Sequence, residues 1–116
     1  GPGWEEAARR VLDGVAALPE AALFLRPVTE EDVEGYFEVI KAPMDLGTVR
    51  RRLLRKQYGA PAEALADARL VWRNCHVFND VEDEVYAWGA RCEAAFEAAW
   101  TAAGLPGGGG SVMRDD

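Results

Sequence analysis

The sequence predicts an all-α fold, a bundle of four helices with one long connection between the first and the second helix. Apolar residues recur at the i, i+3, i+4, i+7 spacing of a helix in four separate stretches of the chain. The first connection between these stretches is long and the other two are short. At 116 residues, the chain is long enough to bury one apolar core and too short for two domains.

The first helix is expected over residues 4–18, with charged side chains opposite its apolar face. Gly14 weakens this helix by about 1 kcal/mol relative to alanine, a cost that packing of the apolar face can offset. Pro19 marks its end. Residues 1–3 are expected to be a leader left by protease cleavage. The apolar face consists of Trp4, Ala7, Ala8, Val11, Leu12, Val15 and Leu18.

The next segment, residues 19–43, lacks helical periodicity but is rich in Leu, Phe, Val and Tyr. Loops of this length within a compact domain are usually functional and pack through their own side chains. We therefore expect the segment to lie against the bundle and not to act as a linker. Thr29 can cap a short helical turn here, because the three acidic residues after it suit a helix N-terminus.

The second helix is expected to begin after Asp45, a suitable N-cap. Gly59 and Pro61 mark its end and the start of the third helix. One face of the second helix is basic, which is compatible with a nucleic-acid contact. A solvated face that pairs with acidic residues is favoured, because the whole chain is acidic and no aromatic residues alternate with the charges. The basic residues are Arg50, Arg51, Arg52, Arg55 and Lys56.

The third helix is expected to run to Phe78, and the fourth repeats the apolar pattern to about Ala103. The chain from Gly104 is Gly-rich and lacks an apolar face. We therefore expect the domain to cover residues 4–103, followed by a flexible tail over residues 104–116.

The net charge and the residue types present limit the classes of partner and activity that this chain can have. The net charge is −7 and the pI is near 4.7, which argues against a phosphate backbone as partner and favours a basic one, such as a lysine-rich peptide. No long apolar run or signal peptide is present, so we expect no membrane contact. No nucleophile–base pair, metal-spaced ligand set or Gly-rich phosphate loop is found, so no enzyme, metal or cofactor is expected.

The two cysteines, Cys75 and Cys92, fall on apolar helix faces and are expected to be buried, reduced thiols. A disulfide or a metal pair is the less favoured alternative. His76 is the single histidine, which argues against a His/Cys zinc site. We expect its side chain to lie on the helix surface and not in a binding site.

Two separated motifs suggest a family. Asn79 stands where the third helix gives way to an acidic loop, within residues 74–80, and Tyr36 precedes the Pro-Met-Asp-Leu start of the second helix, residues 43–46. With these motifs in this order, residues 4–103 resemble a bromodomain, the module that binds acetyl-lysine. The resemblance implies a left-handed four-helix bundle in which the long loop forms one wall of the ligand pocket.

The resemblance also implies roles for three residues. The Asn79 amide would donate to the acetyl oxygen, although Asn79 could instead merely cap the helix. The Tyr36 hydroxyl would contact the same oxygen through water, although it could also be a core tyrosine. Phe78 is expected to pack and not to bond the ligand. An unmodified lysine would be rejected, because its charge would be desolvated without a partner.

The apolar walls implied by the resemblance come from the long loop and the start of the fourth helix. Some family members have a Trp-Pro-Phe shelf where this chain has residues 22–24, Ala-Leu-Phe, so the large aromatic shelf is missing. A shallower pocket is expected. The wall residues are Phe24, Pro27, Val28, Val33 and Val85.

Nine acidic residues lie in two segments, residues 29–40 and 79–90, and neither segment contains a Lys or Arg. In a bromodomain these two segments would face each other across the pocket mouth. Such a rim would steer a lysine-rich peptide and raise its association rate. Ordinary solvated loop charge is the alternative. The residues are Glu30, Glu31, Asp32, Glu34 and Glu38 in the first segment, and Asp80, Glu82, Asp83 and Glu84 in the second.

The resemblance implies a nuclear, monomeric reader of acetylated lysine on histone tails or other nuclear proteins, without direct nucleic-acid binding. The alternative is a degenerate bromodomain fold that has lost the ligand and acts as a protein–protein adaptor. The reduced shelf favours that alternative.

Overall fold

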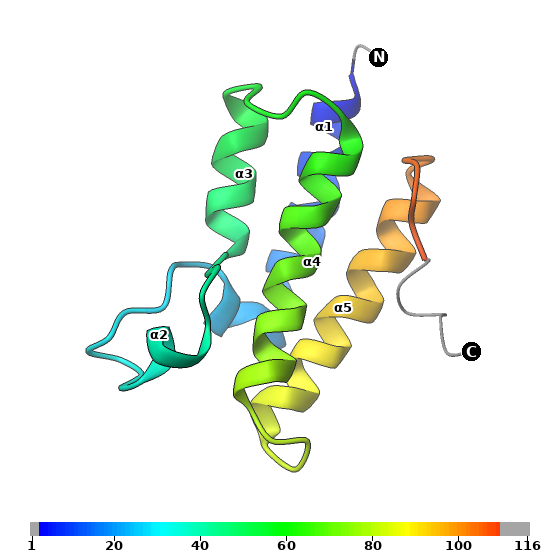
Figure 1. Ribbon diagram of the computed structural model, residues 1–116. Helices are drawn as coiled ribbons and strands as arrows, with labels where there is room; N and C mark the ends of the chain where they lie inside the picture. The colour runs from blue at the N-terminus through cyan, green and yellow to red at the C-terminus, as the bar shows by residue number, and fades with distance from the viewer. Residues whose placement is uncertain (1–2, 110–116) are drawn as a thin grey trace.

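The computed structural model describes residues 3–109, and over this range the chain is helical without any strand. Two short elements lie between the first two long helices: the 3₁₀ helix η1 (Pro19–Phe24) and the one-turn helix α2 (Tyr36–Val39). No helix within residues 3–109 is long and apolar enough to span a bilayer. The four long helices are α1 (Trp4–Ala16), α3 (Leu46–Leu54), α4 (Pro61–Phe78) and α5 (Glu84–Ala102) (Figure 1).

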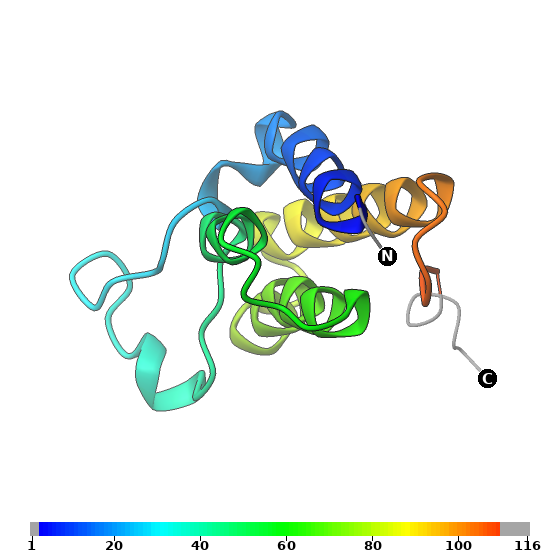
Figure 2. The same cartoon turned by 90° about the horizontal axis from the view of Figure 1, so that it is seen from above.

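The four long helices surround one apolar core. Viewed along the bundle, α1, α3, α4 and α5 form its corners, and the connection that carries α2 projects to one side (Figure 2). Edge-to-face contact between Phe24 and Trp72, with ring centroids 5.7 Å apart, ties η1 to α4. The all-α bundle predicted from the apolar periodicity is therefore confirmed. The largest fully buried side chains are Trp72, Trp100, Phe96, Val49 and Cys92.

The start of α1 lies at Trp4, where the apolar pattern predicted it. Gly3, expected to belong to a leader, is the N-cap of α1, with φ 92° and its carbonyl accepting from Ala7 N–H at 3.1 Å. Residues 1 and 2 lie outside the described range. The helix ends at Ala16, before the predicted Leu18, because the chain turns there into η1.

Polar caps define the starts of the later helices. The Asp45 carboxylate accepts from the backbone N–H and the hydroxyl of Thr48, at 2.9 and 2.7 Å, and Pro61 occupies the first position of α4. Both assignments are confirmed. Asp83 caps α5 in the same way, accepting from Val85 N–H at 2.9 Å.

The end of α3 corrects the sequence prediction. Lys56, and not Gly59, takes the left-handed conformation, with φ 54°. The Lys56 N–H bonds to the Leu53 carbonyl at 3.1 Å and the Gln57 N–H to the Arg52 carbonyl at 2.9 Å. This is a Schellman motif, which satisfies carbonyl groups that the last helical turn leaves free.

Two residues of the basic run on α3 pair with acids on neighbouring helices. The Arg50 guanidinium lies 2.8 Å from Asp13 of α1, and that of Arg52 lies 2.8 Å from Asp67 of α4. Asp67 also accepts from the Tyr58 hydroxyl at 2.6 Å. These pairs favour the interpretation of the run as a helix face that pairs with acidic residues.

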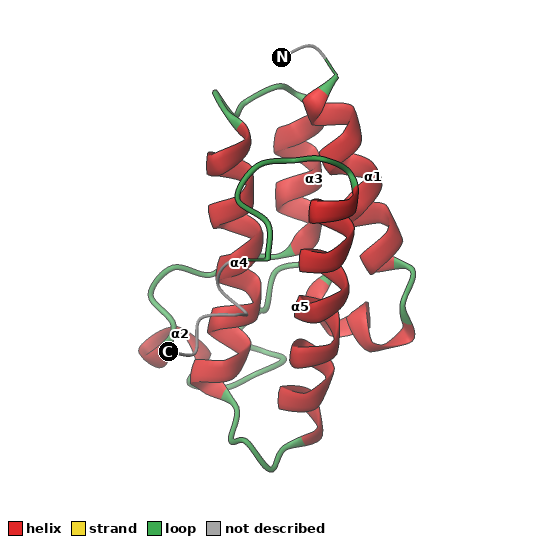
Figure 3. Cartoon of the chain, turned by 90° about the vertical axis from the view of Figure 1, so that its right-hand side faces the viewer, coloured by secondary structure: helices red, strands yellow, loops and turns green. Residues whose placement is uncertain are grey.

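The long connection is fixed to the bundle at both of its ends. The Leu25 carbonyl accepts from Gly47 N–H at 3.1 Å, and a Cβ at Gly47 would lie only 2.6 Å from that oxygen. At the other end, the buried Asn74 side chain of α4 donates to the Ala42 carbonyl at 2.9 Å. Thr29 caps a turn, as expected, but the only helix in this part of the connection is α2. The connection is thus attached to the bundle at both ends, as the prediction of a packed segment requires, and its path is seen from another side in Figure 3.

The chain after α5 folds back onto the bundle over residues 104–109, so the expected flexible tail is wrong for this part. Leu105 is buried, and the Trp100 indole donates to the Pro106 carbonyl at 2.8 Å. The Glu97 carboxylate accepts from Gly109 N–H at 2.7 Å. Residues 110–116, the rest of the predicted tail, lie outside the described range.

Candidate functional site

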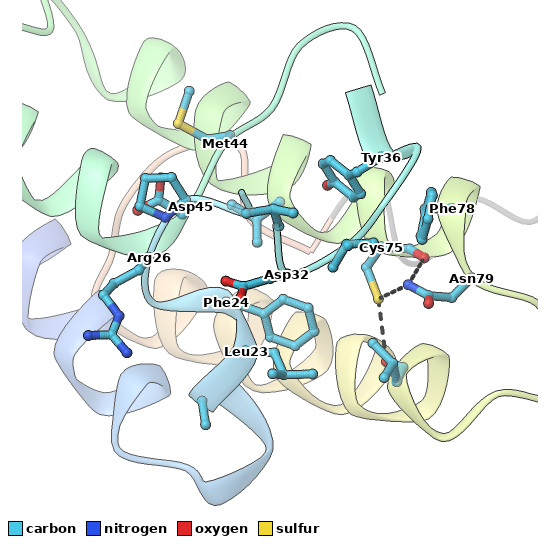
Figure 4. Close-up of a pocket in the computed structure, with 16 residues that line it drawn as sticks. Leu23, Phe24, Arg26, Asp32, Tyr36, Met44, Asp45, Cys75, Phe78 and Asn79 are labelled. Atoms are coloured by element: carbon cyan, nitrogen blue, oxygen red, sulfur yellow. Dashed lines mark hydrogen bonds between the residues drawn. The ribbon is translucent and has the colours of Figure 1, made fainter. Parts of the chain in front are cut away.

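A cavity of about 290 Å³ opens between the α1–α3 connection, the end of α4 and the start of α5 (Figure 4). Its lining is mostly apolar, with one carboxamide and one phenol among the side chains. The structure brings together in this one cavity all the residues that the sequence suggested for ligand contact. These are Phe24, Pro27, Val28, Val33, Tyr36, Phe78, Asn79 and Val85.

Asn79 is both the C-cap of α4 and part of the cavity wall. Its backbone is extended, with φ −101° and ψ 144°, so the chain leaves the helix here. Its backbone N–H and its side-chain Nδ2 both donate to the Cys75 carbonyl, at 3.1 and 3.0 Å. The same nitrogen also makes a long, weak contact with the Cys75 sulfur at 3.9 Å, which a ligand acceptor can replace, and the Oδ1 remains free for a ligand. Capping and ligand binding are therefore compatible roles for this residue.

Tyr36 and Phe78 form the aromatic part of the site. Their ring centroids are 4.9 Å apart with a 57° interplanar angle, and Tyr36 is only 8% exposed. Burial, together with the nearby Cys75, raises the pKa of the Tyr36 phenol. The hydroxyl therefore stays protonated at neutral pH. Within residues 3–109 no protein group hydrogen-bonds to it, so it can serve a ligand or a water.

Cys75 is a wall residue that the sequence analysis did not assign to the site. It lies one helical turn before Asn79, on the same face of α4, and this spacing could have revealed it. Burial raises the pKa of its thiol to about 11, so the group is neutral. The thiol donates to the Val85 carbonyl at 3.4 Å. Cys75 and Cys92 are both free and buried, which confirms their prediction as reduced thiols.

Gly89 lets α5 approach α4 beside the cavity. A Cβ built on Gly89 would lie 2.5 Å from the Cys75 sulfur and 3.3 Å from its Cβ. Only glycine fits this crossing without displacing the thiol. The close approach brings the first turn of α5, which carries Val85, to the cavity wall.

The shelf is aliphatic and open. Ala22 and Leu23, which stand in place of the Trp-Pro pair of some family members, do line the cavity, and Leu23 is 55% exposed. Phe24 is buried and packs on Trp72. Residues 22 and 23 thus occupy the position of the shelf, but their side chains offer a ligand less apolar surface than Trp and Pro would. Four further lining residues were not predicted: Arg26, Met44, Asp45 and Val71.

The nine acidic residues of the two loops are all exposed, and within residues 3–109 none of them takes part in an ion pair. Only Asp32 lines the cavity. Two have local structural roles, because Glu30 accepts from Gly35 N–H at 2.9 Å and Asp83 caps α5. Their negative charge is therefore not neutralised by neighbouring cations.

His76 does not line the cavity, but it is less exposed than predicted. Its ring stacks on Tyr86, with centroids 4.4 Å apart, and its Nδ1 lies 3.9 Å from the Glu93 carboxylate. Both partners belong to α5. His76 therefore fills the interface between α4 and α5, where it is partly buried.

Similarity to known proteins agrees with this geometry. The bromodomain family matches residues 8–91. Bromodomain adjacent to zinc finger domain protein 2A of Mus musculus is 47% identical over 77 residues, which cover 66% of this chain and 4% of that protein. Transcription factor GTE11 of Arabidopsis thaliana is 39% identical over 80 residues, 67% of this chain and 13% of that protein. The chain therefore spans a small part of the curated relatives it matches.

Two solved structures share the architecture. The bromodomain of human BAZ1A superposes with a TM-score of 0.85 at 24% identity, covering 90% of this chain and 98% of that one. The second bromodomain of Candida albicans Bdf1, bound to an imidazopyridine, gives a TM-score of 0.81 at 30% identity, covering 86% and 99%. The bundle is accordingly left-handed, as the resemblance implied. Together with the cavity at the end of α4, these matches establish that the chain belongs to the bromodomain family.

Proposed function

We propose that this domain is a reader of acetyl-lysine, and that the cavity beside Asn79 holds the acetylated side chain. Bromodomains are generally acetyl-lysine readers of chromatin proteins and are binding modules, not enzymes. The observation that carries the proposal is the Asn79 carboxamide, which lines a largely apolar cavity and whose second N–H has only a long contact with the Cys75 sulfur, at 3.9 Å.

The chemistry of the walls suits an acetylated lysine. The acetyl oxygen would accept from the Asn79 amide, and a water held by the Tyr36 hydroxyl would provide a second contact. The methylene stem would pack on Val28, Val33 and Val85, which line the cavity. An unmodified ammonium in this position would lose its hydration and leave the Asn79 donor without an acceptor, at a cost of several kcal/mol.

We expect weak binding to a single acetyl-lysine, with a Kd of about 10 µM to 1 mM. Few ligand atoms are buried and one direct polar contact is made, while the association entropy must be offset. The small shelf formed by Ala22 and Leu23 adds little apolar contact outside the cavity. Nanomolar affinity for one short, singly acetylated peptide would contradict this estimate.

The adaptor alternative requires a cavity that is filled or closed. A cavity of about 290 Å³ that retains both Asn79 and Tyr36 favours the reader. We further propose that the partners are acetylated histone tails or other nuclear proteins, that the protein is nuclear and that the isolated domain is monomeric. Because residues 104–109 pack on the bundle, we propose that the domain extends beyond residue 103 and includes Gly109.

The direct test is a calorimetric titration of the domain with pairs of histone-tail peptides that differ only in acetylation of one lysine. The acetylated member should bind and the unmodified member should not, because only the acetyl group supplies a neutral acceptor for Asn79. Equal affinity for both members of every pair would rule out the reader and favour the adaptor.

A further inference from the structure

We propose that Arg26 reads a carboxylate side chain of the bound peptide, next to the acetyl-lysine. The inference rests on the proposed function and extends it to a sequence preference. Arg26 lines the cavity, and Figure 4 places it at the end opposite Asn79, with its guanidinium directed away from Asn79. A peptide whose acetyl-lysine reaches Asn79 would therefore pass Arg26 outside the cavity.

The backbone on both sides of Arg26 is held in place. The carbonyl of Leu25 is bonded to Gly47 N–H at 3.1 Å, and the ring of Pro27 fixes its own φ. The Cβ that any other residue would bring to position 47 would lie 2.6 Å from the Leu25 oxygen, so this attachment depends on glycine. The backbone at Arg26 is thus held in place, so a contact made there would cost side-chain freedom but little backbone freedom.

The charge of Arg26 is available. Within residues 3–109 its guanidinium forms no ion pair and no side-chain hydrogen bond, in contrast to the other arginines that face acidic neighbours. Asp32 lines the same cavity, yet no ion pair joins the two side chains. A guanidinium matches a carboxylate through two parallel N–H donors, so an acidic side chain is the partner that its geometry suits.

The surrounding acidic loops decide what kind of peptide can use this contact. Their field disfavours an anionic peptide as a whole, but exposed charges are screened beyond about 8 Å at physiological ionic strength. A carboxylate can therefore be favourable close to Arg26 while lysines are favoured elsewhere on the peptide. The preferred ligand would carry an acidic residue on the Arg26 side of the acetyl-lysine and basic residues on the other side.

The test uses acetylated peptides that carry either Glu or Gln at one flanking position at a time, titrated at physiological ionic strength, where the acidic loops are screened. Wild type should bind the Glu peptide about two- to fivefold more tightly at one position, the range expected of an exposed ion pair. Arg26→Gln keeps most of the side-chain length and should bring that ratio to about one. Arg26→Lys should retain part of the preference.

Arg73→Gln is the matched control. Arg73 is exposed on α4, does not line the cavity and has no ion pair within residues 3–109, so this variant removes the same charge elsewhere. It should keep the wild-type preference. A ratio near one at every position in wild type, or a preference that persists in Arg26→Gln, would overturn the inference.

Failure of the proposed function would look different. If the Glu and Gln peptides bind equally and both lose affinity in Asn79→Ala, the acetyl-lysine site stands and only the role of Arg26 is wrong. If neither peptide binds wild type, or if binding is indifferent to acetylation, the reader and the Arg26 contact are both wrong.

Discussion

The side-chain amide of Asn79 donates to the carbonyl of Cys75 at 3.0 Å, so the group proposed to meet the ligand is already held by the helix that it terminates. This hydrogen bond directs the nitrogen toward α4 and fixes the orientation of the carboxamide before any ligand arrives. Pre-orientation of a donor lowers the cost of binding, since little rotational freedom remains to be lost.

Asn79→Ala should abolish measurable binding of acetylated peptide. The acetyl oxygen would be buried without its direct donor, a loss of about 1 to 3 kcal/mol from a weak complex. The fold should survive with a small loss of stability, about 0.5 to 1.5 kcal/mol, because the side-chain bond to the Cys75 carbonyl and the weak contact with its sulfur disappear. Calorimetric titration and thermal melting of both proteins check the two effects separately. A folded Asn79→Ala protein with wild-type affinity would refute the assignment.

Tyr36→Phe should weaken binding less than Asn79→Ala does. The substitution removes a hydroxyl that would act only through water and leaves the ring packed against Phe78, 4.9 Å away. Stability should change little, since no protein partner of that hydroxyl is found within residues 3–109. The same titration checks this order of effects. A larger loss for Tyr36→Phe than for Asn79→Ala would mean that the hydroxyl, and not the amide, is the main donor.

Local signals were enough to predict the long helices. Apolar periodicity located all four, and Asp45 and Pro61 marked the correct starts because capping depends on a few neighbouring residues. The end of α3 was misassigned to Gly59, since a lysine in the left-handed conformation has no sequence signature. The docking of residues 104–109 was missed for another reason. It depends on Glu97 and Trp100, and Gly-rich composition gives no sign of such partners.

The sequence predicted which residues line the cavity, but not how the loop that carries several of them is attached to the bundle. Every wall residue named from the family resemblance lines the cavity. Cys75 was not assigned to the site because its place on an apolar helix face predicted only a buried thiol, and Arg26 because the resemblance implied only apolar residues for the loop wall. The attachment of the loop through Asn74 and Gly47 joins residues far apart in the chain, so neither position could be singled out without coordinates.

Gly89→Ala should destabilise the domain by about 1 to 3 kcal/mol, because the new methyl group would lie 2.5 Å from the buried Cys75 sulfur. Gly14→Ala is the matched control. Gly14 lies within α1 and a Cβ there meets nothing within 4 Å, so this variant should gain up to about 1 kcal/mol from helix propensity. Denaturant unfolding of the two variants gives both values. Equal stabilisation by the two substitutions would show that α4 and α5 separate at no cost.

Cys75→Ala should relieve the crowding caused by Gly89→Ala. The thiol and the new methyl group compete for one space, so the two substitutions together should cost less than the sum of their separate effects. A double-mutant cycle based on free energies of unfolding measures this coupling. Strict additivity would locate the strain of Gly89→Ala elsewhere, such as against the His76 ring, whose Nε2 lies 3.5 Å from the added Cβ.

Glu97 should make the domain sensitive to acid. Burial alone would raise the pKa of its carboxyl, but hydrogen bonds from Arg69 and from Gly109 N–H hold the pKa below its usual value. A lowered pKa in the folded state adds stability that is fully present above the unfolded value of about 4.3 and is lost as the pH falls through the folded value.

Glu97→Gln removes this titration. At pH 7 it should cost about 1 to 3 kcal/mol, since Arg69 loses a charged acceptor. The difference from wild type should shrink below about pH 4, as the wild-type carboxyl becomes protonated. Thermal melting between pH 7 and pH 3 measures the trend. A difference between the two proteins that stays constant over this range would exclude Glu97 as the source of acid sensitivity.

Binding of a lysine-rich acetylated peptide should weaken as the salt concentration rises from about 50 to about 500 mM, mainly through slower association. The acidic loops are exposed and unpaired within residues 3–109, so their attraction acts at long range and is screened by ions. Stopped-flow measurements with that peptide, and with an acetylated peptide in which the other lysines are replaced by Gln, separate steering from the pocket contact. Association rates that do not depend on salt would show that the acidic residues do not steer the peptide and are ordinary solvated loop charges.

The return of residues 104–109 along the bundle decides where the described chain ends relative to the cavity. Gly107 reaches Leu65, near the start of α4, and α1 begins at the same end of the bundle (Figure 1). The cavity lies at the other end, beyond Phe78. Gly3 and Gly109, the two ends of the described chain, therefore both lie away from the cavity mouth, and neither end covers the surface at which a peptide would enter.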